Sequence, residues 1–273
     1  TCEVIMRIGF IDSGVGGLSI LSAVRACIAA DYIYVMDNRY LPYGEKSEAF
    51  IQSRLTQLSS MLIKHQVDLI VIACNTATTQ AVASLRQQFS IPFVGTVPAI
   101  KPAAAISPEG FAVLATPATC KSAYLQGLIE QFAPGIPVQK VGSSELVLLA
   151  EQKVWYGNNV HDAVEQVIRV SSLVDTSPLY IVLGCTHFPF LAAEIKSCLP
   201  EAVLLDTADA IARRVTQVVK TIDHPTKANG QQLFISTLEL NEQQKGKLAE
   251  LGFDQYECWS KPAEDYSSLS SPS

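Results

Sequence analysis

Two cysteines stand at matching places in the sequence, each at the end of a short apolar run. The stretch from Asp68 reads DLIVIACNT and contains Cys74, and the stretch from Pro178 reads PLYIVLGCT and contains Cys185. Short runs rich in Ile, Val and Leu are typical of buried parallel strands. A thiol that follows such a strand and begins a helix can transfer protons, because a helix N-terminus lowers its pKa from the ordinary value of about 8.5. We therefore predict that Cys74 and Cys185 form a reactive pair.

A second pair of similar stretches precedes these two. RIGFIDSGVG begins at Arg7 and GFAVLATPAT begins at Gly110, and both are apolar runs that end in polar and small residues. The intervals from Asp12 to Cys74 and from Thr116 to Cys185 are 62 and 69 residues. This repetition predicts two related halves whose strand ends bring both thiols to one site. Each motif alone also fits a buried structural cysteine, and only the match between them favours a functional pair.

Asp12 opens the run DSGVGG directly after the first predicted strand. The glycines allow a sharp turn into a helix that starts near Leu18. Ser19 stands where a phosphate-binding G-x-G-x-x-G loop needs its third glycine, and a carboxylate would repel a phosphate. Asp12 is better suited to an ammonium group or to a neighbouring acid, although a plain helix N-cap fits the motif equally well.

His187 lies two residues after Cys185 and can exchange a proton with that thiol or with a substrate. A zinc site is not expected, because this pair supplies only two ligands and no third Cys or His stands at a suitable spacing. Pro42, Tyr43 and Gly44 form a tight turn that can direct backbone N–H groups and a phenol toward a site. By itself this segment indicates only a turn.

Short apolar runs alternate with longer amphipathic stretches, which predicts an α/β fold with parallel strands. Ser47 is a candidate N-cap for a helix whose apolar stripe runs from Ile51 to Leu62, and a second stripe runs from Val160 to Leu173. The expected strands are Arg7–Ile11, Tyr32–Met36, Asp68–Ala73, Phe93–Thr96, Phe111–Ala115, Val138–Val141, Tyr180–Leu183, Val203–Leu205 and Leu233–Ser236.

The composition excludes several classes of protein. The chain has 273 residues, of which 48% are hydrophobic, so it is neither disordered nor fibrous. No apolar run reaches the length of about 18 residues that a membrane span needs. The net charge of −6, without a cluster of Lys and Arg, argues against nucleic acid and for a small-molecule partner. Seven cysteines without a C-x-x-C pair indicate free thiols in the cytoplasm.

The motifs IGFIDSGVGGLSI, YLPYGEKS, VIACNTATT and VLGCTHFPFL occur in this order, and together they resemble the glutamate racemase family. The resemblance extends to about Trp259. It implies a cofactor-independent, metal-free isomerase that inverts the α-carbon of glutamate with two cysteines and supplies D-glutamate for peptidoglycan. It also implies two similar doubly wound domains related by pseudo-twofold symmetry, with the active site in the cleft between them.

The resemblance assigns roles to individual positions. Cys74 and Cys185 correspond to the catalytic bases, Asp12 and His187 to the groups that assist them, and Glu151 to an acid that supports the histidine. The substrate-contacting positions are Asp12, Ser13, Pro42, Tyr43, Gly44, Cys74, Asn75, Thr76, Thr119, Cys185, Thr186 and His187.

The resemblance also suggests domain limits and partners. We expect one domain from 1–97 and 208–259, a second from 98–207, and a loosely held tail at 260–273. A homodimer is expected, and GTVPA from Gly95 is similar to a branch in which some members need a cell-wall precursor as activator. ATPAT at 115–119 departs from the Arg-Gly that many relatives carry before the threonine, so how Thr119 binds a carboxylate stays open.

Three other functions are consistent with parts of the sequence. An aspartate racemase would use the same cysteine pair, and incubation with both amino acids separates the two. A cysteine hydrolase could use Cys185 and His187, but it leaves Cys74 without a role. A two-lobed binding protein would hold glutamate without exchanging its α-hydrogen. A pyridoxal-dependent racemase is disfavoured, because it would leave the cysteine pair unused.

Overall fold

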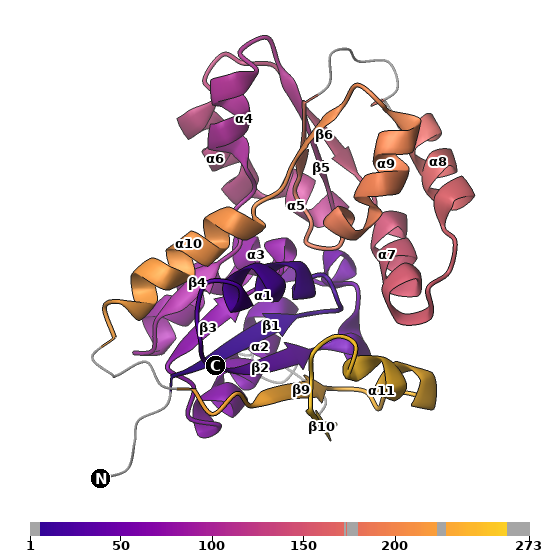
Figure 1. Ribbon diagram of the computed structural model, residues 1–273. Coiled ribbons are helices and arrows are strands. Elements are labelled where there is room, and N and C mark those ends of the chain that lie inside the picture. Colours follow the sequence, from indigo (N-terminus) through magenta and orange to yellow (C-terminus); the bar gives the residue numbers. More distant parts are fainter. Residues whose placement is uncertain (1–5, 172, 174–179, 223–227, 261–273) are drawn as a thin grey trace, which may run out of the picture.

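The computed structural model describes residues 6–171, 173, 180–222 and 228–260, and it contains two parallel β-sheets covered by helices (Figure 1). The α/β class predicted from the alternation of runs is therefore confirmed. No helix in the described part of the chain has the length and apolar character that crossing a membrane requires.

The first sheet has six strands in the order β10-β9-β2-β1-β3-β4, and all of its neighbouring strands pair in parallel. Its inner strand β1 is buried along almost its whole length. The strands are β1 (Arg7–Asp12), β2 (Asp31–Met36), β3 (Leu69–Ile72), β4 (Phe93–Gly95), β9 (Gln232–Ser236) and β10 (Gln255–Cys258).

Helices cover both faces of this sheet, because its inner strands are apolar on both sides. One face packs against α1 (Leu18–Arg25), α10 (Ala208–Val219) and α11 (Glu242–Leu248). The other face packs against α2 (Glu48–Lys64) and α3 (Asn75–Gln88). Ser47 caps α2 by accepting a hydrogen bond from the backbone N–H of Phe50, as its position before the apolar stripe predicts.

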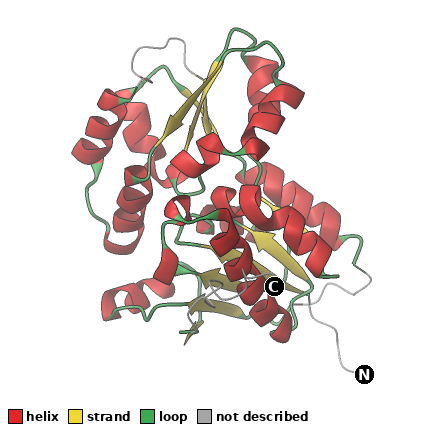
Figure 2. Ribbon diagram, turned by 180° about the vertical axis from the view of Figure 1, so that it is seen from behind, coloured by secondary structure: helices red, strands yellow, loops and turns green. Residues whose placement is uncertain are grey.

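The second sheet has four parallel strands in the order β6-β5-β7-β8. They are β5 (Phe111–Ala115), β6 (Val138–Gly142), β7 (Tyr180–Leu183) and β8 (Val203–Leu205). One face packs against α7 (Glu145–Tyr156), α8 (His161–Val170) and α9 (Ala192–Cys198), and the other against α4 (Ile100–Ile106) and α6 (Ala123–Phe132). Figure 2 shows the same layers from behind.

The two sheets repeat one topology. The order β2-β1-β3-β4 in the first sheet corresponds strand for strand to β6-β5-β7-β8 in the second, and β9 and β10 extend the first sheet. The chain passes from one sheet to the other between β4 and α4, and it returns between β8 and α10. The domain limits 1–97, 98–207 and 208–259 stay a prediction, and most of the expected tail at 260–273 lies outside the described residues.

Two details differ from the sequence prediction. β10 was not expected, because its alternately exposed residues QYEC at a sheet edge form no apolar run. The second predicted stripe is longer than its helix, since Val160 is the N-cap of α8 and Leu173 lies beyond its end. Both side chains are nevertheless buried in the same cluster, so they belong to the core but not to the helix.

Candidate active site

The chemically active side chains follow neighbouring strands in each sheet. Asp12 ends β1 and Cys74 follows β3, while Cys185 follows β7. In the second sheet Ala115, the last residue of β5, takes the place that corresponds to Asp12, and Thr116 takes that of Ser13. The two edges face each other, since the hydroxyl of Thr186 donates a hydrogen bond of 3.0 Å to Asp12 Oδ2. The repeated strand order thus brings both cysteine motifs to one place.

Cys185 forms one end of a chain of polar groups. Its Sγ lies 3.9 Å from Nδ1 of His187, whose Nε2 lies 2.7 Å from Oε1 of Glu151. The carboxylate also accepts the backbone N–H of Val15 at 2.7 Å and the indole N–H of Trp155 at 2.9 Å. Glu151 therefore contacts the histidine, as the resemblance implied.

His187 is buried, and burial alone would lower its pKa. The hydrogen bonds and negative charges of Cys185 and Glu151 outweigh this effect and raise the pKa of His187 well above its usual value. A protonated imidazole donates from both ring nitrogens, toward the sulfur and toward the carboxylate. His187 is thus placed to stabilise a thiolate at Cys185.

Asp12 is fully buried at the opposite edge. Its Oδ1 accepts the backbone N–H of Gly14 at 2.9 Å and the hydroxyl of Ser13 at 3.4 Å. Burial raises the pKa of Asp12 to about 6, although the charge of His187 and the hydrogen bonds from Gly14 and Thr186 oppose the rise. The N-cap of α1 is Gly17, so the N-cap interpretation of Asp12 is wrong.

Cys74 is the N-cap residue of α3, as predicted, and only 7% of it is exposed. Burial and the negative charge of Asp12 nevertheless raise its pKa well above the usual value, against the lowering effect of the Ala77 and Thr76 backbone N–H groups. The predicted lowering by the helix N-terminus is therefore outweighed. The charge of Cys185 is a further, smaller contribution that raises the pKa of Cys74.

A cluster of threonine hydroxyls joins the two edges beside Cys74. Thr76 Oγ1 lies 2.9 Å from Thr116 Oγ1 and 3.2 Å from Thr119 Oγ1, and all three residues are buried. Asn75 is also buried, and its Oδ1 has no hydrogen-bond partner among the described residues. Thr116 was not predicted as a site residue, although its place in the repeat, equivalent to that of Ser13, was a signal for it.

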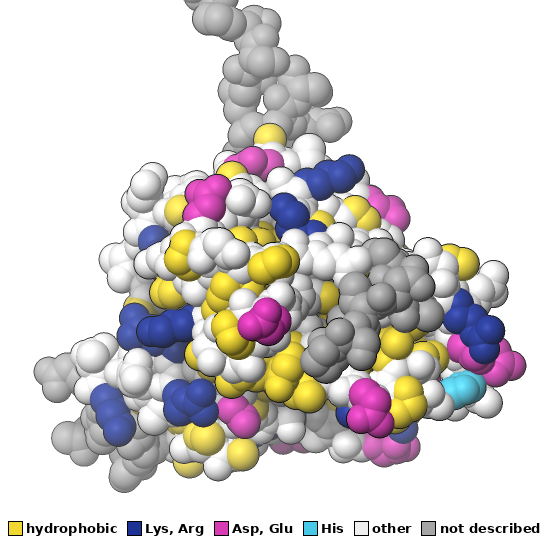
Figure 3. Space-filling model, turned by 90° about the horizontal axis from the view of Figure 1, so that it is seen from above, with side chains coloured by type: hydrophobic (Ala, Val, Ile, Leu, Met, Phe, Trp, Pro, Cys, Tyr) yellow, Lys and Arg dark blue, Asp and Glu magenta, His cyan; other side chains and the backbone are white. Residues whose placement is uncertain are grey.

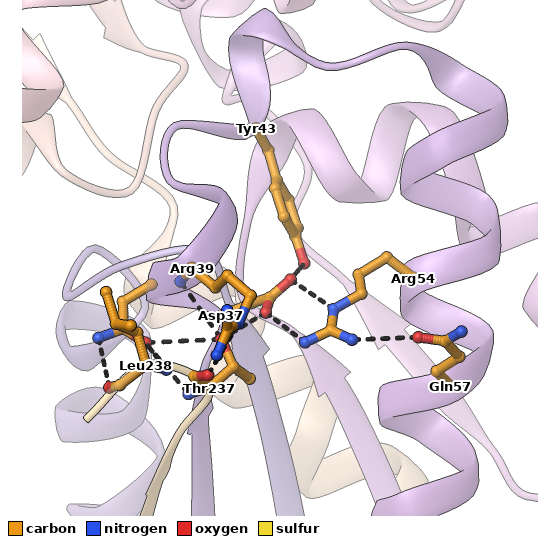
Figure 4. Close-up of polar contacts among 8 residues, drawn as sticks. Asp37, Arg39, Tyr43, Arg54, Gln57, Thr237 and Leu238 are labelled. Atoms are coloured by element: carbon orange, nitrogen blue, oxygen red, sulfur yellow. Dashed lines mark hydrogen bonds and ion pairs between the residues drawn. The ribbon is translucent and has the colours of Figure 1, made fainter. Parts of the chain in front are cut away.

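The Pro42–Gly44 segment borders the same place. The hydroxyl of Tyr43 donates a hydrogen bond of 2.6 Å to Asp37 (Figure 4). Gly44 approaches the second sheet closely, since an added Cβ would lie 3.0 Å from Cβ of Thr116. The Tyr43 hydroxyl is thus engaged by Asp37 of the protein, and the loop approaches the second sheet at Gly44.

One group of possible metal ligands occurs among the described residues. Side-chain atoms of His161, Asp162 and Glu165 on α8 lie within 4.8 Å of one another. Glu165 already pairs with Arg169, and the three residues lie away from the cysteines on an outer helix.

The surface in Figure 3 mixes basic and acidic side chains with apolar ones.

The chain is thus an α/β protein of two similar parallel-sheet halves, each with a cysteine that follows a strand at the edge facing the other half. It belongs to the Asp/Glu/Hydantoin racemase family, whose model matches residues 8–215. The glutamate racemase of Photorhabdus laumondii is 46% identical over 77% of this chain and 74% of that protein. The glutamate racemase of Aliivibrio fischeri is 42% identical over 92% and 96%.

Solved structures show the same fold. Escherichia coli glutamate racemase, crystallised with L-glutamate and the activator UDP-MurNAc-ala, has a TM-score of 0.85 and 35% identity over 93% of this chain and 98% of that one. Glutamate racemase from Aquifex pyrophilus has a TM-score of 0.67 and 30% identity over 91% and 96%.

Proposed function

We propose that this chain interconverts L-glutamate and D-glutamate without a cofactor, with Cys74 and Cys185 as the two proton-transferring groups. The observation that carries the proposal is the pairing of each thiol with its own assisting group, Asp12 near Cys74 and His187 beside Cys185. Two bases are needed because a single base would tend to return the proton to the face it left. Relatives of this chain at 41 to 46% identity are glutamate racemases, which supports glutamate as the substrate.

The protonation states of the free enzyme differ between the two sides. The raised pKa of His187 favours an imidazolium beside the sulfur of Cys185, whereas burial and Asp12 raise the pKa of Cys74 and favour its neutral thiol. Cys185 then removes the α-proton of L-glutamate and Cys74 delivers a proton to the other face, which gives D-glutamate. In the reverse direction Cys74 must first lose its proton, and the Asp12 carboxylate is the group that assists it.

The site must also stabilise negative charge that develops on the α-carboxylate as the proton leaves. Asn75, Thr76, Thr119 and Thr186 supply amide and hydroxyl groups at the two facing edges. The hydrogen bonds between the Thr76 and Thr119 hydroxyls and from Thr186 to Asp12 hold the three threonines in place before the substrate arrives. Such fixed donors need no reorganisation during the reaction, which lowers its barrier.

Replacement of Cys74 or Cys185 by serine tests this mechanism. We expect either variant to lose about 10²- to 10⁴-fold in racemisation, because a serine hydroxyl is a far weaker proton donor and acceptor than a thiol. Racemisation and the exchange of the glutamate α-hydrogen in D₂O are measured for each enantiomer. Cys27→Ser, at an exposed position, is the control and should keep wild-type turnover. Wild-type turnover in both active-site variants would overturn the scheme.

We further propose that the D-glutamate supplies peptidoglycan synthesis in the cytoplasm, and that the enzyme is a homodimer. The six cysteines of the described residues are free thiols, as a reducing compartment maintains them. Sedimentation velocity tests the dimer, and a monomer at micromolar concentration would contradict it.

A cell-wall precursor is a candidate activator. A cavity of about 650 Å³ lies beside the two chain crossings, and its lining includes the cations Arg86, Lys101, Arg213 and Arg214 and the acids Asp206 and Asp209. Four cations suit the phosphates of a nucleotide-linked precursor. Unchanged turnover on addition of such a precursor would contradict this role.

A further inference from the structure

A fully buried ion pair lies at the carboxyl edge of the first sheet, one strand away from Asp12. Asp37 directly follows β2, and both of its oxygens accept from Arg54 of α2, from Nη2 at 2.8 Å and from Nε at 3.0 Å. Neither side chain has any exposed surface. Burying two charges is costly unless the geometry and the additional hydrogen bonds are good. The racemisation mechanism gives this pair no role.

Asp37 also accepts two hydroxyl groups from distant parts of the chain (Figure 4). Tyr43 donates to Oδ2 at 2.6 Å, and Thr237, which follows β9, donates to Oδ1 at 2.6 Å. Burial and the charge of Asp37 raise the pKa of Tyr43 well above its usual value, so its hydroxyl stays a donor. Four donors therefore converge on one carboxylate, whose capacity is about four.

The loop that carries Tyr43 contacts both halves of the site. Leu41 packs against the second sheet's core cluster, which includes Cys185. The ring of Tyr43 belongs to the core cluster that contains Cys74. Gly44 faces Thr116, as described above. A shift of this loop would therefore move backbone atoms that border both thiols.

Asp37 is tied to the catalytic edge through its backbone as well. Its N–H donates to the carbonyl oxygen of Asp12 at 2.8 Å, which continues the pairing of β1 and β2. The guanidinium of Arg54 lies 5.0 Å from the ring centroid of Tyr40 and 5.2 Å from that of Trp259. Asp37 is thus held by its backbone and by Arg54, in addition to its hydrogen bond with the Tyr43 hydroxyl.

We propose that Asp37, oriented by Arg54 and Thr237, is a positioning residue that fixes the Leu41–Gly44 loop for substrate binding. The inference rests on the proposed function, since the loop is placed relative to the two cysteines. It assigns the Tyr43 hydroxyl to the protein and not to the substrate.

Tyr43→Phe is the first test, because it keeps the ring and removes only the donor to Asp37. We expect KM for glutamate to rise about tenfold, which corresponds to the loss of one hydrogen bond to a charged group, with kcat changed less than about threefold. Tyr32→Phe is the matched control. Its buried hydroxyl also donates at 2.6 Å, but to the carbonyl oxygen of Ile28, on the face of the sheet away from the site. Its KM should stay at the wild-type value.

Thr237→Val separates positioning through Asp37 from direct contact with the substrate. Thr237 does not belong to the catalytic or substrate-binding residues. We expect a rise in KM of about threefold, which we would attribute to the lost hydrogen bond to the Asp37 carboxylate. If Tyr43 and Thr237 both act on Asp37, the double variant will not show the product of the two single effects. Asp37→Asn should raise KM further, and the other two variants carry the test if it fails to fold.

Two results would overturn the proposal. One is a KM for Tyr43→Phe equal to that of Tyr32→Phe, and the other is a Thr237→Val enzyme with wild-type KM together with independent effects in the double variant. Failure of the proposed function is a different result: wild-type protein would then not exchange the α-hydrogen of glutamate at all.

Discussion

At the scale of single residues, the ionised carboxylate of Asp12 is unfavourable in the folded protein because it is fully buried. Burial disfavours its charged form and raises its pKa from 3.8 to about 6. Under the proposed mechanism, assistance to Cys74 needs that carboxylate ionised, since only the ionised form can take up a proton. The folded protein therefore accepts an unfavourable charge where the reaction requires it.

Asp12→Asn should consequently stabilise the protein while it abolishes assistance to Cys74. Because the folded pKa lies above the unfolded one, the native state binds more protons between about pH 4 and pH 6, and its stability falls as the pH rises through that interval. The shift lowers the free energy of unfolding by about 3 kcal/mol, and this loss is complete above pH 6. Denaturant unfolding at pH 4 and pH 8 measures it, with the exposed Glu109→Gln as the control. An equal stability difference at both pH values would contradict the prediction.

The sequence predicted those site residues that follow apolar strands, because a strand end places a side chain at the sheet edge. Cys74, Asp12 and Cys185 belong to this group. Asp37 and Arg54 could not be paired from the sequence, since their contact depends on how α2 lies against the sheet. The direction of the Tyr43 hydroxyl could not be predicted for the same reason, because it depends on where Asp37 lies.

At the scale of elements, the glycine loop between β1 and α1 determines how closely the second half can approach. A Cβ on Gly14 would lie 2.0 Å from Oε1 of Glu151 and 2.7 Å from Nε2 of His187. A Cβ on Gly16 would meet Nδ1 of His187 at 2.4 Å. The glycines serve close approach here, which the phosphate-loop comparison in the sequence did not indicate.

Gly14→Ala should displace the Glu151 and His187 side chains and lower kcat about 10²-fold, since displacements of about 1 Å in a catalytic group have effects of this size. Gly127→Ala is the matched control. It lies in α6 with nothing within 4 Å of an added Cβ, so it should keep kcat and gain about 0.5 to 1 kcal/mol of helix stability. Steady-state kinetics and thermal unfolding of both variants check this. Full activity in Gly14→Ala would contradict the prediction, because it would show that the loop can shift to accommodate the added Cβ.

At the scale of the whole molecule, the site exists only where two sheets face each other. Contacts across this boundary include the hydrogen bond from Val15 to Glu151, that from Thr186 to Asp12 and that between Thr76 and Thr116. The repeat in the sequence predicted two facing halves, because related strand orders place equivalent residues at equivalent edges. It did not predict these contacts, which depend on the relative orientation of the sheets.

Because groups from both sheets surround the proposed substrate site, glutamate should stabilise the two halves together. At a concentration of about a hundred times Kd, binding contributes about 2.7 kcal/mol, which raises the melting temperature by about 5 °C. Calorimetry with either enantiomer should show one transition that moves upward. L-lysine, whose longer side chain ends in an ammonium group instead of a carboxylate, is the control and should leave the transition in place. Two separate transitions, of which glutamate moves only one, would place the binding site within a single half and contradict a shared site.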